Sequence, residues 1–395
     1  MLPPVIVLVA VAGLVTQAAA STSTGPDDAA HLRGLGGVVR TAGLRPAAGV
    51  GGDNLAGFSP QSVSYVSSAE GWVLGTVPCG ARRCVRLLHT VNDGAIWSEL
   101  PAPPIPSRGS DSPAPRVRFA DDDDGWVFST LPGVTTVGAW STHDGGSRWS
   151  PIAFPVKSPY AAGVEDLEAA GGTVQAAVQV GANVDVFSSP VSHDAWRKTG
   201  GPFALGAGPV PSGELALQGR TGWFVQNNRV VVSGARLGRS GAWRAWMPPC
   251  LEAGGPIELS APSTSDVDAV CTEGVWTGTK ISVDFYTSTD GGARFGSARP
   301  VPASSADLTA AAGASTVAVA TSTSTASSVT AELELSFDGG TAWTTAYRHA
   351  GGGWLDLEFT TSSQGVAILA GLGGGPNTML MSRDGGRAWS TVRFA

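Results

Sequence analysis

The sequence predicts an all-β protein: a β-propeller with seven blades of four antiparallel strands each. Three observations support this prediction. A turn-like frame, Ser/Thr-x-Asp-x-Gly-x-x-aromatic, recurs along the chain. The aromatic residue that ends each unit's turn returns at intervals of 46 to 52 residues. A second marker, of the type Gly-Trp-Val, precedes several of these turns.

The recurring aromatic residues give the number of units. They are Trp97, Trp149, Trp196, Trp243, Phe295, Trp343 and Trp389. Each interval has room for four short strands joined by turns. One such sheet cannot bury both of its faces, whereas seven sheets stacked in a ring can, with the Trp side chains filling the space between blades. A six-bladed ring would require removing the third or fourth unit, and both keep a hairpin pattern, so we expect seven.

The units follow one plan: an apolar inner strand, a Gly-Trp-type strand, a strand that ends in the turn, and an outer strand opened by the aromatic residue. We predict that they span residues 63–100, 117–154, 164–198, 214–246, 257–298, 308–347 and 354–394. The third unit has lost two turn residues, and in the fourth unit residues 237–243 replace the frame. The last unit is complete, so the ring should close without an N-terminal strand.

The frame has a local physical explanation. Its Ser/Thr and Asp side chains can bond to the backbone of one tight turn, and its Gly supplies a positive φ. This frame resembles the Asp-box, or BNR repeat, of the sialidase-like, sortilin-like and Ycf48-like propellers. In that family the box is a structural turn, so the resemblance implies a structural role for the Asp-position residues. They are Asn92, Asp144, Asp290, Asp338 and Asp384.

The N-terminus predicts export. An apolar run at residues 5–15, followed by Ala18-Ala19-Ala20, resembles a secretory signal peptide, although no Lys or Arg precedes it. We therefore expect a signal peptide at 1–20, a low-complexity linker at 21–57 and the propeller at 58–395. The predicted location is extracytoplasmic, either secreted or associated with the cell envelope. An uncleaved signal segment is the one membrane attachment that the sequence suggests.

Four Cys residues in an exported chain favour two disulfides over a metal site. Cys79 and Cys84 lie between two strand-like segments and could link one hairpin, in which case Cys250 and Cys271 would pair across a blade boundary. The chain has no Cys-x-x-Cys spacing, so we expect no metal and no cofactor. The acidic run 121–124 is either a solvated turn or a set of oxygen ligands for Ca²⁺.

The predicted topology separates two faces of the ring. The first face carries the turns between strands one and two and between strands three and four, which include the Asp-box frames. The second face carries the turns between strands two and three and the links between blades, and by family resemblance it is the usual ligand face. Ordinary solvated turns are the alternative there. The candidate ligand-binding residues are Arg82, Arg83, Arg108, Asn227, Asn228, Arg229, Lys280, Arg348 and His349.

The sequence supports recognition better than catalysis. Sialidases with this repeat use three Arg, a Tyr–Glu pair and an Asp for catalysis. In this sequence the early Arg-Ile-Pro element is missing, and the four Tyr residues form no Tyr–Glu pair. No catalytic residue is therefore assigned. The net charge of −7 argues against nucleic acid. The resemblance implies a non-catalytic scaffold for recognition or assembly, with an unknown protein or glycan partner, and we expect a monomer. The alternative is a secreted sialidase-like glycoside hydrolase.

Overall fold

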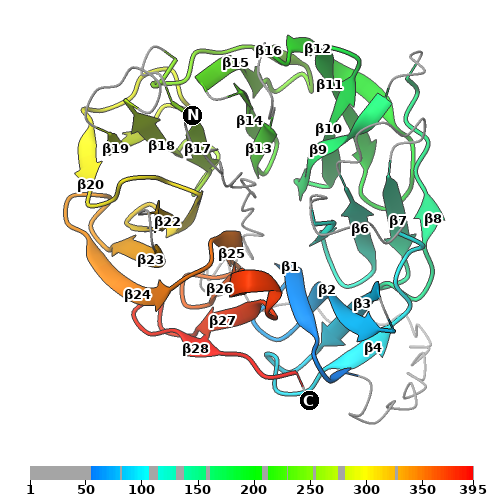
Figure 1. Ribbon diagram of the computed structural model, residues 1–395. Helices are drawn as coiled ribbons and strands as arrows, with labels where there is room; N and C mark the ends of the chain where they lie inside the picture. Colours follow the sequence, from blue (N-terminus) through cyan, green and yellow to red (C-terminus); the bar gives the residue numbers. More distant parts are fainter. Residues whose placement is uncertain are drawn as a thin grey trace, which may run out of the picture.

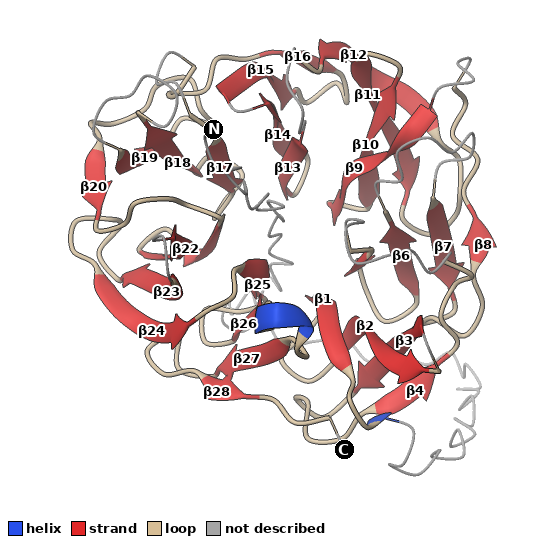
Figure 2. Cartoon of the chain, viewed as in Figure 1, coloured by secondary structure: helices blue, strands red, loops and turns tan. Residues whose placement is uncertain are grey.

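The computed structural model is a ring of seven antiparallel sheets, which we call blades 1 to 7 in chain order (Figure 1). It describes residues 55–80, 82–105, 114–129, 138–156, 161–206, 212–228, 230–251, 255–274, 281–324 and 328–394. The predicted signal peptide, residues 21–54 of the predicted linker and the candidates Arg108, Arg229 and Lys280 lie outside the described residues. Strands and loops make up almost all of the described chain (Figure 2).

Each of the first four blades has its strands paired in chain order. Blade 1 consists of β1 (Ser59–Tyr65), β2 (Gly71–Cys79), β3 (Arg82–Thr90) and β4 (Ser98–Leu100). Blade 2 consists of β5 (Arg116–Phe119), β6 (Asp124–Phe128), β7 (Ala139–His143) and β8 (Ser150–Pro151). Blade 3 consists of β9 (Ala161–Ala170), β10 (Thr173–Val180), β11 (Asn183–Pro190) and β12 (Arg197–Ala204). Blade 4 consists of β13 (Ser212–Gln218), β14 (Thr221–Asn228), β15 (Val230–Leu237) and β16 (Trp243–Ala245).

The last three blades repeat the plan. Blade 5 consists of β17 (Ile257–Ser260), β18 (Val267–Glu273), β19 (Ser282–Ser288) and β20 (Arg299–Val301). Blade 6 consists of β21 (Leu308–Gly313), β22 (Thr316–Ser324), β23 (Val329–Ser336) and β24 (Thr344–Ala350). Blade 7 consists of β25 (Trp354–Phe359), β26 (Gly365–Leu369), the short 3-10 helix η2 (Leu372–Gly374), β27 (Thr378–Ser382) and β28 (Ser390–Thr391).

The seven-bladed fold predicted from the sequence is confirmed. Each predicted unit coincides with one blade, and the boundaries differ by at most six residues. Blade 7 takes all four of its strands from the C-terminal part of the chain, so the ring closes without an N-terminal strand, as expected. Blade 1 then packs directly against blade 7, and β1 lies beside β25 (Figure 1).

The hydrophobic core lies between the blades. Seven clusters of buried side chains are present, and each joins two neighbouring blades. The cluster that closes the ring brings Val63 and Trp97 of blade 1 against Val366 and Met381 of blade 7. Because every blade buries both faces in this way, no blade can be removed without exposing two apolar surfaces.

The Trp residues of the Gly-Trp-type strands fill these interfaces. Trp72, Trp126 and Trp223 are completely buried, and each packs in a cluster shared with the next blade. The Trp72 ring stacks on Phe119 of blade 2, with ring centroids 3.8 Å apart. The expected role of the indoles as spacers between blades therefore holds for this set.

The turn between β23 and β24 shows how the repeated frame folds. The Ser336 hydroxyl donates to Asp338 Oδ1 at 2.8 Å and accepts from the Gly340 N–H at 2.7 Å, while Asp338 Oδ1 also accepts from the Ala342 N–H at 2.8 Å. These bonds lower the pKa of Asp338, with the Ala342 N–H as the largest cause. Gly340 has φ +85°, and a Cβ there would lie 2.3 Å from the ring of Phe285 in blade 5.

The corresponding turns of blades 2, 5 and 7 have the same bonds around their Asp residues, and blade 1 uses Asn92 in the same place. The residues are Thr142 with Asp144, Ser288 with Asp290, Ser382 with Asp384 and Thr90 with Asn92. This geometry is what a backbone-stabilising role requires. That role of the Asp and Asn residues stays a prediction.

Both predicted disulfides are present. Cys79 and Cys84 link the ends of the β2–β3 hairpin, five residues apart. Cys250, after the last strand of blade 4, pairs with Cys271 in β18 of blade 5. Two disulfides fit an extracytoplasmic protein. Within the described residues, no helix is long and apolar enough to cross a membrane.

Candidate functional site

The first strand of every blade faces the axis of the ring (Figure 1). In or next to each of these strands, one polar residue directly precedes a buried apolar residue. We call these seven polar residues the inner ring: Ser62, Arg116, Asp166, Glu214, Glu258, Asp307 and Asp356. Five of the seven are carboxylates, although charged residues make up only 14% of the chain.

Inner-ring side chains connect neighbouring blades at five of the seven boundaries, from blade 7 through blade 1 to blade 5. Asp356 Oδ2 accepts the Val63 N–H at 3.0 Å, and Ser62 Oγ accepts the Val117 N–H at 3.2 Å. On the opposite side of the ring, Asp166 accepts the Leu215 N–H at 2.9 Å and Glu214 accepts the Leu259 N–H at 2.6 Å. The first strand is the edge of its sheet, so its outward N–H groups need partners from a neighbouring blade.

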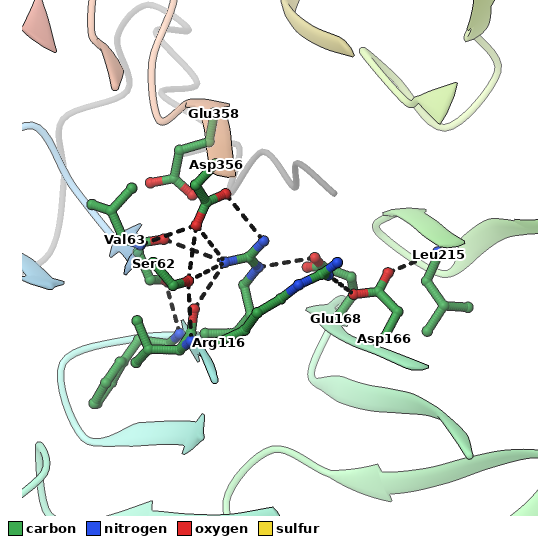
Figure 3. A network of polar contacts seen from close by, with 12 residues as sticks. Ser62, Val63, Arg116, Asp166, Glu168, Leu215, Asp356 and Glu358 are labelled. Carbon is green, nitrogen blue, oxygen red and sulfur yellow. Dashed lines mark hydrogen bonds and ion pairs between the residues drawn. The ribbon is translucent and has the colours of Figure 1, made fainter. Parts of the chain in front are cut away.

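Two arginines of β5 neutralise part of this charge (Figure 3). Arg116 pairs with Asp166 at 2.7 Å. Arg118, which is 2% exposed, donates from Nε to Glu168 at 3.0 Å and from Nη1 to Asp356 at 3.4 Å. Burial alone would lower the pKa of Arg118, but Asp356 and Glu168 raise it above its ordinary value. One buried cation therefore connects blades 2, 3 and 7.

The carboxylates of blades 4 to 6 are less well compensated. Glu214, Glu258 and Asp307 are all at most 7% exposed, and each has one oxygen with no hydrogen-bond partner among the described residues. Burial raises the pKa of Asp307 to about 6, and it raises the pKa of Glu214 and of Glu258 well above the usual range. Buried carboxyl groups favour the neutral form because desolvation penalises the charge.

Within the part of the chain that the structure describes, no group of three or more His, Cys, Asp or Glu residues is arranged to hold a metal ion. Asp121 bonds the backbone N–H groups of Asp123 and Asp124, which closes the turn between β5 and β6. Asp124 itself contacts His143 Nδ1 at 2.5 Å.

A second polar site lies on the first face of the ring, at the boundary between blades 4 and 5. It is a pocket of about 870 Å³ lined by turns of both blades. We call it the arginine pocket, because its charged lining consists of four arginines and one aspartate: Arg220, Arg236, Arg239, Arg244 and Asp290. Trp246 also lines it. Within the described residues, no ion pair joins any of these arginines to a carboxylate, so the pocket carries an uncompensated positive charge.

The arginine pocket occurs where blade 4 departs from the repeated frame. The β15–β16 turn, at residues 237–243, lacks the Asp, carries Arg239 and is flanked by Arg236 and Arg244. Arg236 and Arg244 stand directly opposite each other on β15 and β16, an arrangement of like charges that destabilises a sheet. The sequence did show this departure, but only the fold places Arg220 of the β13–β14 turn beside it.

The ligand-face residues predicted from the sequence are dispersed around the second face, and several have partners within the protein. Arg82 is exposed at the tip of the β2–β3 hairpin, whereas Arg83 bonds Thr76 Oγ1 at 2.7 Å. Arg348 pairs with Glu332, and His349 lies 3.1 Å from the Gly351 carbonyl oxygen.

Asn227 is 3% exposed, and its amide bonds both the N–H and the carbonyl of Ile257 in blade 5. Asn228 ends β14, opposite Val230. Asn227 thus links two blades, and the described candidates do not converge on one pocket.

The sialidase arrangement can be compared directly. Two arginines, Arg116 and Arg118, lie in the first strand facing the axis, and both bind carboxylates of the protein. The arginine pocket brings four arginines together, but none of its lining residues is a Tyr or a Glu. Tyr65 bonds Glu358 through its backbone N–H, while its ring packs against Gly71 and its hydroxyl lies near Gly94 in the β3–β4 turn.

Comparisons with known proteins support the fold and leave the function open. No family model and no curated protein matches the chain. Among solved structures it is similar to "YCF48 bound to D1 peptide", with 15% identity, a TM-score of 0.51 and coverage of 82% of this chain and 92% of that one.

Two enzymes are also similar in fold over most of this chain. An ulvan lyase of polysaccharide lyase family 25, bound to -[GlcA(1-4)Rha3S]-, matches with 9% identity and a TM-score of 0.53 over 85% of this chain and 95% of that one. A puromycin hydrolase matches with 14% identity and a TM-score of 0.54, over 85% of this chain but only 53% of its own. The protein is thus an all-β seven-bladed propeller. Its structural neighbours include both a peptide-bound protein and enzymes.

Proposed function

We propose that this protein is an exported, non-catalytic propeller that recognises a protein or glycan partner and serves as an assembly scaffold. The observation that carries the proposal is the use of the charged groups near the axis. Two ion pairs join Arg116 to Asp166 and Arg118 to Asp356. Three carboxylates also accept backbone N–H groups of the next blade, namely Asp166, Glu214 and Asp356. Groups held in this way stabilise the ring, and recognition is left to the turns.

The structural neighbours agree with this proposal at the level of ligand class. One was solved with a bound peptide and another with a bound oligosaccharide. The predicted signal peptide and the two disulfides favour a role outside the cytoplasm. We expect a monomer, in keeping with a closed ring that has no unpaired sheet face.

One observation favours the alternative, a glycoside hydrolase. Burial raises the pKa of Glu165 to about 7 and that of Asp307 to about 6. A carboxyl group that keeps its proton near neutral pH can act as a general acid. Both groups, however, are at most 7% exposed, which restricts their access to a polysaccharide.

The test compares capture with hydrolysis. The immobilised protein is incubated with the extracytoplasmic fraction and with a glycan array, and saturable retention of a partner is expected. The same preparation is assayed with a fluorogenic sialoside. The scaffold proposal is overturned if the protein hydrolyses the sialoside with saturation and E165Q or D307N abolishes this activity. A protein that retains no protein or glycan also contradicts it.

A further inference from the structure

The arginine pocket is unusual for this protein because its charge is opposite to that of the chain. The whole chain carries a net charge of −7, yet four arginines and one aspartate line a single pocket. Asp290 is already committed to its own turn, where its Oδ1 accepts from the Arg294 N–H at 2.9 Å and from the Ser288 hydroxyl at 2.9 Å. These bonds lower the pKa of Asp290, with the Arg294 N–H as the largest cause, so it stays ionised and offsets only one of the four arginine charges.

The fold holds the central arginine of this pocket in place. The guanidinium carbon of Arg236 lies 5.9 Å from the centre of the buried Trp223 ring. Its Nη2 also lies over Gly291, where a Cβ would come within 2.2 Å. The glycine of the blade 5 turn thus makes room for an arginine of blade 4, and an aromatic face supports it. A prepositioned guanidinium loses little freedom when it binds an anion.

Arg244 stands opposite Arg236 on the neighbouring strand, so two planar guanidinium groups face one space. Such a pair carries a repulsion that an anionic group between them removes. Arg220 and Arg239 are exposed and extend the positive surface on both sides of this pair. The spread of the charge over several turns suits a ligand with more than one anionic group.

We propose that the arginine pocket binds an anionic polysaccharide, one that carries carboxylate or sulfate groups on successive sugar units. Trp246 lines the pocket and offers an apolar surface to a sugar ring, while its Nε1 is held by the Gly292 carbonyl at 2.7 Å. Anionic groups attached directly to stiff rings lose less entropy on binding than carboxylates on flexible peptide side chains. This inference rests on the proposed recognition function and names its ligand class.

The experiment is affinity electrophoresis of the purified protein in gels that contain polygalacturonate, dextran sulfate, poly-glutamate or neutral dextran. We expect retardation by one or both anionic polysaccharides, none by dextran, and less retardation as salt is added. The test variant is R220Q/R239Q/R244Q, which keeps Arg236 and its packing. It should bind at least about tenfold more weakly. The control R148Q/R197Q/R393Q removes the same charge from exposed positions outside the pocket and should bind normally.

Three outcomes overturn the inference. Equal weakening in both triple variants would show that overall charge, and not the pocket, attracts the polymer. Stronger retardation by poly-glutamate than by either polysaccharide would show that the ligand is an acidic polypeptide. No retardation by any anionic polymer would show that the pocket binds none. If the wild type captures a partner from the extracytoplasmic fraction but no anionic polymer retards it, the scaffold proposal survives while this inference fails.

Discussion

Replacement of Arg118 by Met should unfold the ring at much lower denaturant than the wild type requires. Arg118 is 2% exposed and donates hydrogen bonds to Glu168, Asp356, Ser62 and the carbonyls of Val63 and Val117. Met fills a similar volume with no charge. The variant therefore leaves two buried carboxylates, on blades 3 and 7, without their common cation.

The magnitude follows from that burial. Removal of one partner of a buried ion pair costs about 3–5 kcal/mol, because the remaining charge is left desolvated and unpaired. We expect the free energy of unfolding of R118M to fall by about this amount. Urea titration followed by Trp fluorescence is suited to the measurement, since buried indoles lie at several blade interfaces.

A matched control separates burial from the presence of an ion pair. Arg148 pairs with Asp144 at 2.7 Å, a distance similar to those of the buried pairs, but its side chain is 87% exposed. R148M should cost at most about 1 kcal/mol, because exposed pairs are weak. The cost of R118M should also shrink in acid, where protonation removes the uncompensated charges. If R118M and R148M cost the same, the inner ring does not stabilise the protein in the way described.

Three further predictions concern the turns, the acidic groups and the disulfide between blades. G340A should lower the free energy of unfolding by about 1–3 kcal/mol for the contact with the neighbouring blade, and by about 1–2 kcal/mol more for the positive φ. G172A, at φ +78° with no atom within 4 Å of its Cβ, should lose only the amount due to the positive φ. Equal losses of the two variants in urea titration would contradict this. Burial raises the pKa of Asp307 from 3.8 to about 6, so its contribution to stability is complete below about pH 4 and is lost as the pH rises through 6. D307N should therefore become more stable relative to the wild type as the pH rises between these limits. A difference in stability that does not depend on pH would refute the assignment. The Cys250–Cys271 bond closes a separation of 21 residues, so C250A/C271A should lose about 3 kcal/mol of unfolding free energy, and a loss near zero would show that the link is redundant.

The sequence contained part of the information on the candidate site. The inner-ring residues occupy the same position in every unit, directly before an apolar residue of the first strand, as in Glu214-Leu215 and Glu258-Leu259. Alignment of the seven units on their first strands would have shown this pattern. The repeated turns lie at the ends of the third strands, far from this position, so they give no signal for the inner ring.

The arginine pocket was only partly visible in the sequence. The loss of the turn frame at 237–243 and the arginines in that region are visible in the sequence. Their partners are distant in sequence: Arg220 belongs to another turn of blade 4, and Asp290 and Gly291 belong to blade 5. No local pattern states that these turns meet on one face.

The sequence alone determined the number of blades, their order and their boundaries, because strand length, turn chemistry and apolar spacing act over a few neighbouring residues and repeat about every 50. Tertiary structure alone decided which charges meet. Asp356 reaches Ser62 across 294 positions of sequence only because blade 7 closes on blade 1. Ring closure is a collective result of all seven interfaces, so the charge balance at the axis and in the arginine pocket cannot be deduced from any one unit.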